Sequence, residues 1–259
     1  MQAPHPPLLS YYDKEHNRSS WVRGIFNRTA RDYDRLEAVV ALGTGSWYRR
    51  RALRSAGLKR GMTVLDVGTG TGLLARAAAQ IAGDAAQVTG IDPSPGMLEH
   101  AKVPAGVRLL AGSAESMPVA DACADFLCMG YALRHISDLS AAFAEFYRVV
   151  RPSGRVCVLE ITLPKGTLAR AILKAWLNGL VPWIARVVAR PGDAPLLIHY
   201  WWDTILTCVP PDTILRGLRE AGFVEIERRV ELAIFSAYCA HKPGEGRRPE
   251  SSARRSQSE

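Results

Sequence analysis

The sequence predicts an α/β fold built on a seven-stranded, mostly parallel sheet, with helices on both faces and an antiparallel last strand pair. Apolar runs rich in β-forming residues alternate with helical segments, the order expected when crossover helices join parallel strands. The first run leads into three alternating glycines, Gly68, Gly70 and Gly72, and then into an Ala/Leu-rich helix. Two apolar runs without a helix between them, 223–231 and 232–240, predict the antiparallel pair.

The other elements follow in chain order. Strands are expected at 63–67, 87–91, 107–110, 125–129 and 155–161, the last of them after a turn at 151–154. Helices are expected over 73–82, 95–102, 139–150 and 211–221, the last with a proline at its start and a glycine after its end. Seven strands and a closing hairpin are typical of the Rossmann-like sheet of class I methyltransferases rather than of a six-stranded dinucleotide-binding fold.

Two regions fall outside this sheet. Residues 1–60 predict a helical cap, with breaks at Gly24 and at 43–45, ahead of a methyltransferase domain over 61–241. Within that domain, residues 167–210 are rich in Trp, Leu, Ile and Val. Because an insertion at this point can overhang the active edge of the sheet, we expect an apolar lid there.

The composition is that of a globular protein, with 47% hydrophobic residues and a net charge of +8 over 259 residues. The first 60 residues hold 12 Lys/Arg against 5 Asp/Glu, but no RNA-binding module accompanies them, so no nucleic-acid partner is expected.

Five scattered cysteines predict free thiols, with no disulfide and no metal site. No signal peptide and no run of ~18 uncharged apolar residues is visible, which favours a cytoplasmic location. The polar tail, 242–259, is expected to be disordered.

The glycine loop and two acidic residues predict S-adenosylmethionine as the cofactor. The third glycine comes one residue earlier than in the dinucleotide fingerprint G-x-G-x-x-G. Asp66, two residues before Gly68, would repel a pyrophosphate and suits a ligand that carries a sulfonium and an ammonium group. Asp92 ends the second strand, roughly 20 residues past the loop, where a carboxylate can accept both ribose hydroxyls.

Four stretches of the chain resemble the UbiE/MenG family, the C-methyltransferases of ubiquinone and menaquinone biosynthesis. Residues 26–36 resemble the family's F-x-x-x-A-x-x-Y-D-x-x-N signature, and the glycine loop follows. Residues 131–136 resemble its F-G-L-R-N-V, and residues 147–155 its Y-R-V-L-K-P-G-G-R. The glycine loop marks any class I methyltransferase, whereas the first and third stretches point to this family. The resemblance extends over residues 26–242.

This resemblance implies an S-adenosylmethionine-dependent methyltransferase and assigns its cofactor contacts. Gly68 and Gly70 would supply backbone contacts to the methionine end of the cofactor, and Asp92 would bind the ribose. Tyr33 would close over the amino-acid end. Ser113 and Ala114 stand where the family places its adenine contacts.

The chemistry of a phenolic acceptor predicts two catalytic residues. Carbon methylation of such a ring needs a base and a group that stabilises the oxyanion. We expect His135, which follows the fourth strand, to take the phenolic proton, and Arg134 to stabilise the phenolate. A structural histidine with a satisfied ring is the alternative for His135. His199 with Tyr200 is a second candidate pair.

The sequence departs from the family pattern around the expected acceptor pocket. Glu37 stands in place of the signature's asparagine, His135 in place of the asparagine after the arginine, and residues 131–132 read Tyr-Ala instead of Phe-Gly. The cofactor elements are kept. Methyl transfer is therefore better supported than a quinone acceptor.

Residues 168–190 form an amphipathic segment in the expected lid. Leu168, Ile172, Trp176, Leu180 and Trp183 are interspersed with Arg170, Lys174 and Arg186, and Pro182 is expected to kink or interrupt the helix. Such a segment can cover the core, or it can contact the surface of the inner membrane peripherally, and the two roles are compatible.

Three classes of function fit the motifs. The first is carbon methylation of a small lipophilic, quinol-like ring, and the second is O- or N-methylation of a secondary metabolite. The third is a cofactor-binding protein without transfer activity, or an RNA-modifying enzyme. The chain lacks the N/D-P-P-[FYW] signature of base-amine methyltransferases, which argues against RNA. The acceptor, the methylated atom and the oligomeric state, including a homodimer, are left open by the sequence.

Overall fold

The structure is a computed structural model that describes residues 3–189 and 192–244. Its seven strands form one sheet in the order β3-β2-β1-β4-β5-β7-β6. The strands are β1 (Val64–Val67), β2 (Val88–Asp92), β3 (Arg108–Ala111), β4 (Ala124–Gly130), β5 (Val150–Ile161), β6 (Val224–Glu231) and β7 (Phe235–His241). Strands β1 to β5 pair in parallel, and β7 pairs antiparallel with both β5 and β6. The predicted seven-stranded α/β sheet with an antiparallel last pair is confirmed.

Ten α-helices are described around this sheet. They are α1 (Arg18–Thr29), α2 (Tyr33–Val40), α3 (Gly45–Ser55), α4 (Leu73–Ala82), α5 (Pro95–Glu99), α6 (Leu139–Val149), α7 (Thr167–Lys174), α8 (Val181–Val188), α9 (Ala194–Thr207) and α10 (Pro211–Glu220). A π-helical segment, η5 (Ala175–Leu180), joins α7 to α8. Short 3₁₀ turns are η1 (Glu15–Asn17), η2 (Ala30–Asp32), η3 (Ala85–Gln87) and η4 (Leu133–His135).

The sheet carries one apolar core on each face. Helices α6 and α10 cover one face, where Phe143 and Phe146 are fully buried against the sheet. Helices α3 and α4 cover the other face, with Leu53 and Phe126 in its core. The central strands are therefore buried on both sides, which explains why they read as continuous apolar runs.

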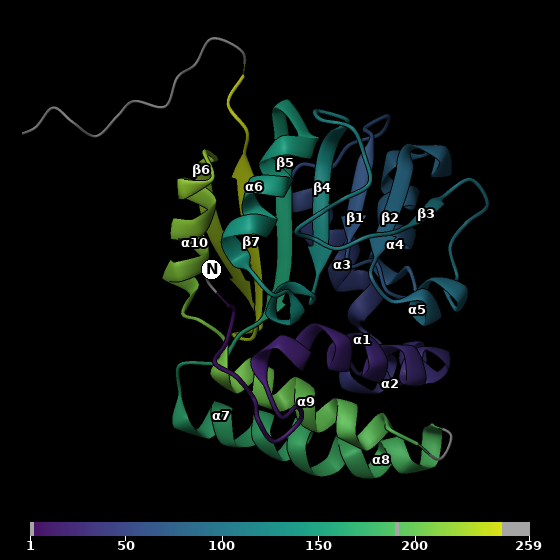
Figure 1. Cartoon of the computed structure of the whole chain (residues 1–259), viewed down its shortest axis with the longest axis vertical. Coiled ribbons are helices and arrows are strands. Elements are labelled where there is room, and N and C mark those ends of the chain that lie inside the picture. Colours follow the sequence, from purple (N-terminus) through teal and green to yellow (C-terminus); the bar gives the residue numbers. More distant parts are fainter. Residues whose placement is uncertain (1–2, 190–191, 245–259) are drawn as a thin grey trace, which may run out of the picture.

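A helical layer covers the carboxyl edge of the sheet (Figure 1). Helices α1 and α2 lie directly beneath the strand ends, and α7, α8 and α9 lie below them. The two sets share an apolar core that includes Ile25, Leu36, Val181 and Tyr200. The N-terminal cap and the 167–210 insertion, far apart in the sequence, thus form one layer over the edge where parallel α/β sheets bind their ligands.

Local structure differs from the sequence-based expectations at two points, Gly24 and residues 151–154, and agrees with them at Pro182. Gly24 does not break α1, because its neighbours continue the helical pattern and a single glycine costs only ~1 kcal/mol. Residues 151–154, expected as a turn, extend β5 toward its start, with Ser153 at φ +64° and its N–H donating to the Lys242 carbonyl at 3.0 Å. Pro182 does interrupt the lid helix: a π-helical segment precedes it, and the proline lies in the first turn of α8. The expected disordered tail lies, from residue 245 on, outside the described residues.

Within the described residues, one helical stretch is long and apolar enough to cross a membrane by length and composition alone. It is the lid stretch Thr167–Val188. One of its faces packs against the protein through Leu173, Leu177, Val181 and Ala185. A helix with one face fixed to a folded domain cannot be surrounded by lipid, so this stretch is part of the helical layer rather than a membrane span.

Candidate active site

The glycine loop forms the floor of the site. Gly68 and Gly70 have φ values of +69° and +54°, which favour glycine. A Cβ on Gly68 would lie 2.6 Å from the Cβ of Ala132, whereas a Cβ on Gly70 would meet no atom within 4 Å. Both glycines line the cavity described below. The backbone at Gly70 therefore faces open space, where a ligand can approach the main chain closely.

Asp66 supports this loop from below. It is completely buried, and its Oδ2 accepts a hydrogen bond from the Thr69 hydroxyl at 2.6 Å. Burial raises the pKa of Asp66 to about 7, against the hydrogen bonds that favour its ionised form. Asp66 is not among the residues that line the cavity. Its placement fits a role in holding the loop better than the direct contact with a cationic ligand expected from the sequence.

Asp92 presents an oriented carboxylate beside the loop. Its Oδ2 accepts from the Gly70 N–H and its Oδ1 from the Ser94 N–H, each at 2.8 Å. Burial raises the pKa of Asp92 to about 6, while the two backbone donors oppose that shift. The side chain lines the cavity. The two fixed donors aim the carboxylate at whatever occupies the space above the loop.

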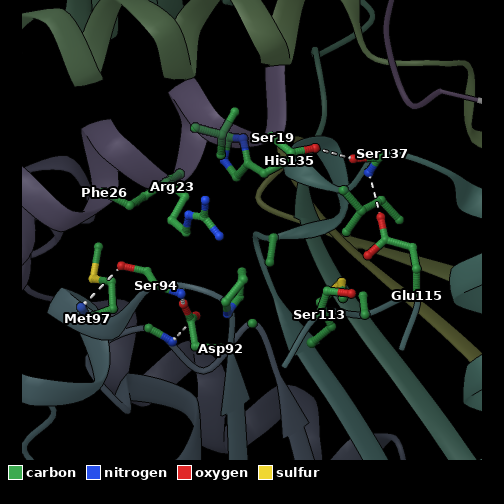
Figure 2. A pocket seen from close by; sticks show the side chains of 18 of the residues that line it. Ser19, Arg23, Phe26, Asp92, Ser94, Met97, Ser113, Glu115, His135 and Ser137 are labelled. Atoms are coloured by element: carbon green, nitrogen blue, oxygen red, sulfur yellow. Dashed lines mark hydrogen bonds between the residues drawn. The ribbon is translucent and has the colours of Figure 1, made fainter. Parts of the chain in front are cut away.

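These groups surround one cavity of about 600 Å³ between the carboxyl edge of the sheet and α1 (Figure 2). That volume is in the range of small-molecule sites. The lining includes all the sequence-predicted cofactor residues except Asp66, and it includes His135. The full lining is Ser19, Val22, Arg23, Phe26, Tyr33, Gly68, Gly70, Asp92, Pro93, Ser94, Met97, Ser113, Ala114, Glu115, Met129, Gly130, Tyr131, Ala132, His135, Ile136, Ser137, Asp138 and Ala141.

The N-terminal signature ties the helical cap to the loop. The side-chain oxygen of Asn27 on α1 accepts from the Ser94 hydroxyl at 2.6 Å and from the Gly96 N–H at 2.9 Å. The Asp34 carboxylate on α2 accepts from the hydroxyl of Thr71, inside the glycine loop. Tyr33, next to Asp34, lines the cavity. The signature residues thus position α1 and α2 over the cofactor loop.

His135 lies on η4, just after β4. Its Nδ1 is 3.4 Å from the Tyr200 hydroxyl, and its ring stacks on Tyr200 with a centroid distance of 5.3 Å. The ring also meets Phe26 edge-on at 5.1 Å. Burial, and next the positive charge of Arg134, lowers the pKa of His135 well below its ordinary value of 6.5. The imidazole is therefore neutral at neutral pH, and Nε2 is the nitrogen that Tyr200 does not engage.

The second candidate pair is split by the structure. Tyr200 is fully buried beside His135, so it joins the first candidate. His199 points elsewhere: its Nδ1 lies 2.6 Å from the Asn178 side-chain oxygen, and it does not line the cavity. Adjacent residues on a helix lie about 100° apart, so the side chains of His199 and Tyr200 point in different directions and do not reach one site.

Arg134 does not line the cavity. Its guanidinium forms an ion pair with Glu160 on β5, and both side chains are buried. Its carbonyl oxygen accepts from the guanidinium of Arg18 on α1 at 3.3 Å. The expected role of Arg134 as a phenolate stabiliser stays a prediction. In this placement, Glu160 neutralises the positive charge of Arg134 outside the cavity.

Several lining residues carried no sequence signal of their own. Arg23 and Ser19, one helical turn apart on α1, reach the cavity from the cap, and Ser19 lies 2.7 Å from the Ser137 hydroxyl across its rim (Figure 2). Phe26 belongs to the N-terminal signature, which could have identified it. Tyr131, which replaces the family's phenylalanine, adopts a φ of +59° and lines the same space.

Glu37, which stands in place of the family's asparagine, is neutralised by an arginine from another helix. Arg49 on α3 donates to both carboxylate oxygens of Glu37, at 2.7 and 3.2 Å, and is almost completely buried. A bidentate pair of this kind fixes geometry. The replacement therefore changes how α2 and α3 are joined without placing a new charge in the cavity.

The site fits S-adenosylmethionine. The oriented Asp92 carboxylate can accept the ribose hydroxyls, and the open backbone at Gly70 can approach the methionine end. Ser113 and Ala114 line the cavity where the adenine is expected. Among the described residues, no group of three His, Cys, Asp or Glu side chains is placed to hold a metal ion.

Comparison with known proteins agrees with this geometry. The sequence profile of the ubiE/COQ5 methyltransferase family matches residues 13–242 of the chain. The ubiquinone/menaquinone biosynthesis C-methyltransferase UbiE of Shewanella halifaxensis is 28% identical over 216 residues, 81% of this chain and 85% of that protein. The demethylmenaquinone methyltransferase of Staphylococcus aureus is 28% identical over 214 residues, 80% of this chain and 87% of that protein.

Solved structures show the same fold. A possible histamine N-methyltransferase from Thermotoga maritima superposes with a TM-score of 0.59 at 20% identity, covering 85% of this chain and 99% of its own. Phosphoethanolamine N-methyltransferase 2 of Haemonchus contortus, in complex with S-adenosyl-L-methionine, gives a TM-score of 0.55 at 18% identity, covering 76% of this chain and 52% of its own. The sheet is therefore that of the class I methyltransferases.

Proposed function

This chain belongs to the ubiE/COQ5 methyltransferase family and is an S-adenosylmethionine-dependent methyltransferase, and from that premise we propose that it methylates a ring carbon of a lipophilic, quinol-like acceptor. Two relatives at 28% identity carry the names of C-methyltransferases of quinone biosynthesis. A lipophilic acceptor partitions into lipid, so we place the enzyme in the cytoplasm with peripheral contact to the inner membrane.

One observation carries the proposal: a neutral imidazole lies in an aromatic part of the cavity. His135 lines the cavity, and burial keeps its pKa well below 6.5. The rings of Phe26, Tyr33 and Tyr131 line the same space. Flat aromatic walls suit a flat acceptor ring, and a neutral imidazole can accept its hydroxyl proton.

The residues present account for the requirements of the reaction. When bound, S-adenosylmethionine supplies an electrophilic methyl group, and the loop and Asp92 hold it in place. His135 accepts the phenolic proton at Nε2, which raises the electron density on the ring carbon that is methylated. After the methyl group is transferred, that carbon loses its hydrogen as a proton and the ring regains its aromaticity and its hydroxyl group. Tyr200, 3.4 Å from Nδ1, orients the imidazole. The aromatic walls exclude water and hold the ring in line, and such alignment supplies much of the acceleration of a displacement reaction.

The acceptor is identified by transfer of an isotope-labelled methyl group. The purified enzyme is incubated with labelled S-adenosylmethionine and, separately, with the reduced lipid extract and the polar metabolite extract of its source. We expect label in the lipid fraction, on a methyl group attached to a ring carbon by mass and NMR analysis. Label on oxygen or nitrogen, or only in the polar fraction, would instead support methylation of a small metabolite.

A side chain at Gly70 is expected to block cofactor binding. Gly70→Val would fill the open space above the loop and should weaken binding of S-adenosylhomocysteine about 10- to 100-fold, measured by calorimetry. Gly61→Val is the matched control, because Gly61 also has a positive φ, of +82°, and no atom within 4 Å of its Cβ position, but does not line the cavity. Equal affinities for both variants would show that the cofactor does not approach Gly70.

Cofactor affinity is expected to fall at acidic pH through Asp92. The ionised carboxylate accepts hydrogen bonds from the ribose hydroxyls, and its pKa is about 6. Cofactor affinity should therefore drop roughly fivefold, the contribution of one hydrogen bond, as the pH falls from about 7 to about 5. Asp92→Asn should bind weakly and lose this pH dependence. Asp66→Asn controls for the second buried carboxyl, whose pKa is about 7, and should keep it. Persistence of the acidic fall in Asp92→Asn would contradict the assignment.

A further inference from the structure

The lid stretch Thr167–Val188 exposes a continuous apolar stripe. Five large apolar side chains point away from the protein: Leu168 (73% exposed), Ile172 (62%), Leu180 (46%), Trp183 (63%) and Val187 (73%). They are three, four or eight residues apart, and the π-helical segment η5 lies between the second and the third. Exposed leucines scattered singly are ordinary, but a stripe along a helix of about 33 Å marks an interaction surface.

The opposite side of the same helix is fixed to the domain. Leu173, Leu177, Val181 and Ala185 are buried against α2, α9 and the sheet edge. Figure 1 shows α7 and α8 as the outermost elements of the helical layer, on the side away from the sheet. The exposed stripe therefore forms the outer face of the molecule at this end, and it is oriented by a rigid scaffold.

The charge around the stripe has one sign. Between Glu160 and Asp193 the chain holds five basic residues and no acidic one. Lys165, Arg170, Lys174 and Arg186 are exposed on or next to the helix. An apolar stripe with a basic border is complementary to a surface that is apolar inside and anionic outside, which is the headgroup region of an acidic bilayer.

A second copy of the chain is a poorer partner for this face. In a two-fold symmetric dimer the same patch meets itself, so the basic residues of one copy would face those of the other. The stretch offers no acidic residue to neutralise them. A membrane-spanning arrangement is excluded by the buried face.

We infer that the helix Thr167–Val188 docks the enzyme on an anionic bilayer, lying in the plane of the interface with Leu168, Ile172, Trp183 and Val187 inserted among the headgroups and acyl chains. The basic side chains contact lipid phosphates at the same depth. This inference rests on the proposed function and deepens it, since it places the helical layer next to the cavity on the surface where a lipophilic acceptor resides.

The test is co-sedimentation of the full chain with vesicles, without acceptor or turnover. Equal parts phosphatidylglycerol and phosphatidylcholine provide the anionic surface, and phosphatidylcholine alone the neutral one. The wild type should sediment with the anionic vesicles at low ionic strength. Trp183→Ser should weaken this partitioning about tenfold, since it removes a large apolar side chain that would insert into the bilayer. Lys174→Gln with Arg186→Gln should weaken it about fivefold per charge.

Matched controls lie on α3 and just after it. Trp47 is 53% exposed, so Trp47→Ser removes a comparably exposed tryptophan elsewhere. Arg54→Gln with Lys59→Gln removes two exposed charges. Both controls should bind like the wild type. Failure of the wild type to bind anionic vesicles, or equal losses in test and control variants, would overturn the inference. A dimer in light scattering that Ile172→Ser dissociates would replace the bilayer by a second copy. Because no acceptor is present, each result is independent of the proposed reaction.

Discussion

Replacing His135 with alanine is expected to lower the rate of methyl transfer about 100-fold or more while leaving S-adenosylhomocysteine affinity unchanged. The imidazole lines the cavity but makes no hydrogen bond to the glycine loop or to Asp92 among the described contacts. Its removal should therefore affect the acceptor step alone. Single-turnover transfer of labelled methyl to the identified acceptor measures the rate, and calorimetry measures the cofactor affinity.

The dependence of the rate on pH shows whether His135 acts as a base or only fills space in the cavity. Burial lowers the pKa of His135, so at saturating cofactor the wild-type rate should stay level as the pH falls past ~6.5. It should decline only well below that pH, where the imidazole becomes protonated. A histidine with its ordinary pKa would instead give a decline near pH ~6.5. The decline should be absent from His135→Ala.

His135→Asn is the informative second variant, because asparagine is the residue type of the quinone family at this position. If the imidazole is the base, His135→Asn should lose its rate as His135→Ala does, because an amide cannot take the phenolic proton. Retention of most of the rate with asparagine would show that the acceptor needs only a hydrogen-bonding side chain at this position, and it would contradict the role of His135 as the base. If both variants keep the wild-type rate and pH profile, His135 is structural and the catalytic assignment is wrong.

The second large effect concerns the Arg134–Glu160 pair. Arg134→Met is expected to lower the free energy of unfolding by about 3–5 kcal/mol, because it leaves the Glu160 carboxylate buried without its partner. Urea unfolding measures this loss. Arg134→Met combined with Glu160→Gln should regain most of the stability, since the amide keeps the oxygen that accepts from the Ile161 N–H at 3.0 Å without a buried charge.

The double variant also settles what Arg134 does in the reaction. If the arginine only holds η4 in place, stability and methyl-transfer rate should return together. If its charge stabilises the phenolate, the rate should stay low in the stable double variant. A loss below about 1 kcal/mol in Arg134→Met would contradict the ion pair as a structural element.

The sequence by itself determined the sheet, and it identified the residues near the glycine loop that line the cavity, with the exception of Asp66. Strand positions follow from apolar runs, and the loop follows from glycines whose positive φ values are local properties of the chain. Asp92 could be assigned because it ends a strand next to that loop, and parallel strands bring their carboxyl ends to one edge. Short-range patterns were sufficient for these features.

Only the tertiary structure decided the acceptor end. His135 contacts Tyr200, 65 residues away in the sequence, and Arg134 pairs with Glu160, 26 residues away. Although His135 and Arg134 are adjacent in the sequence, their side chains therefore lie in different environments. Whether an arginine is free or neutralised, and whether a lid residue faces the core or the outside, depends on which elements pack together. Periodicity identified residues 168–190 as amphipathic, but only the packing of α7 and α8 on α2 and α9 shows that Trp183 is exposed while Val181 is buried. Burial and pairing set charge and solvation, and both depend on contacts between residues far apart in the chain.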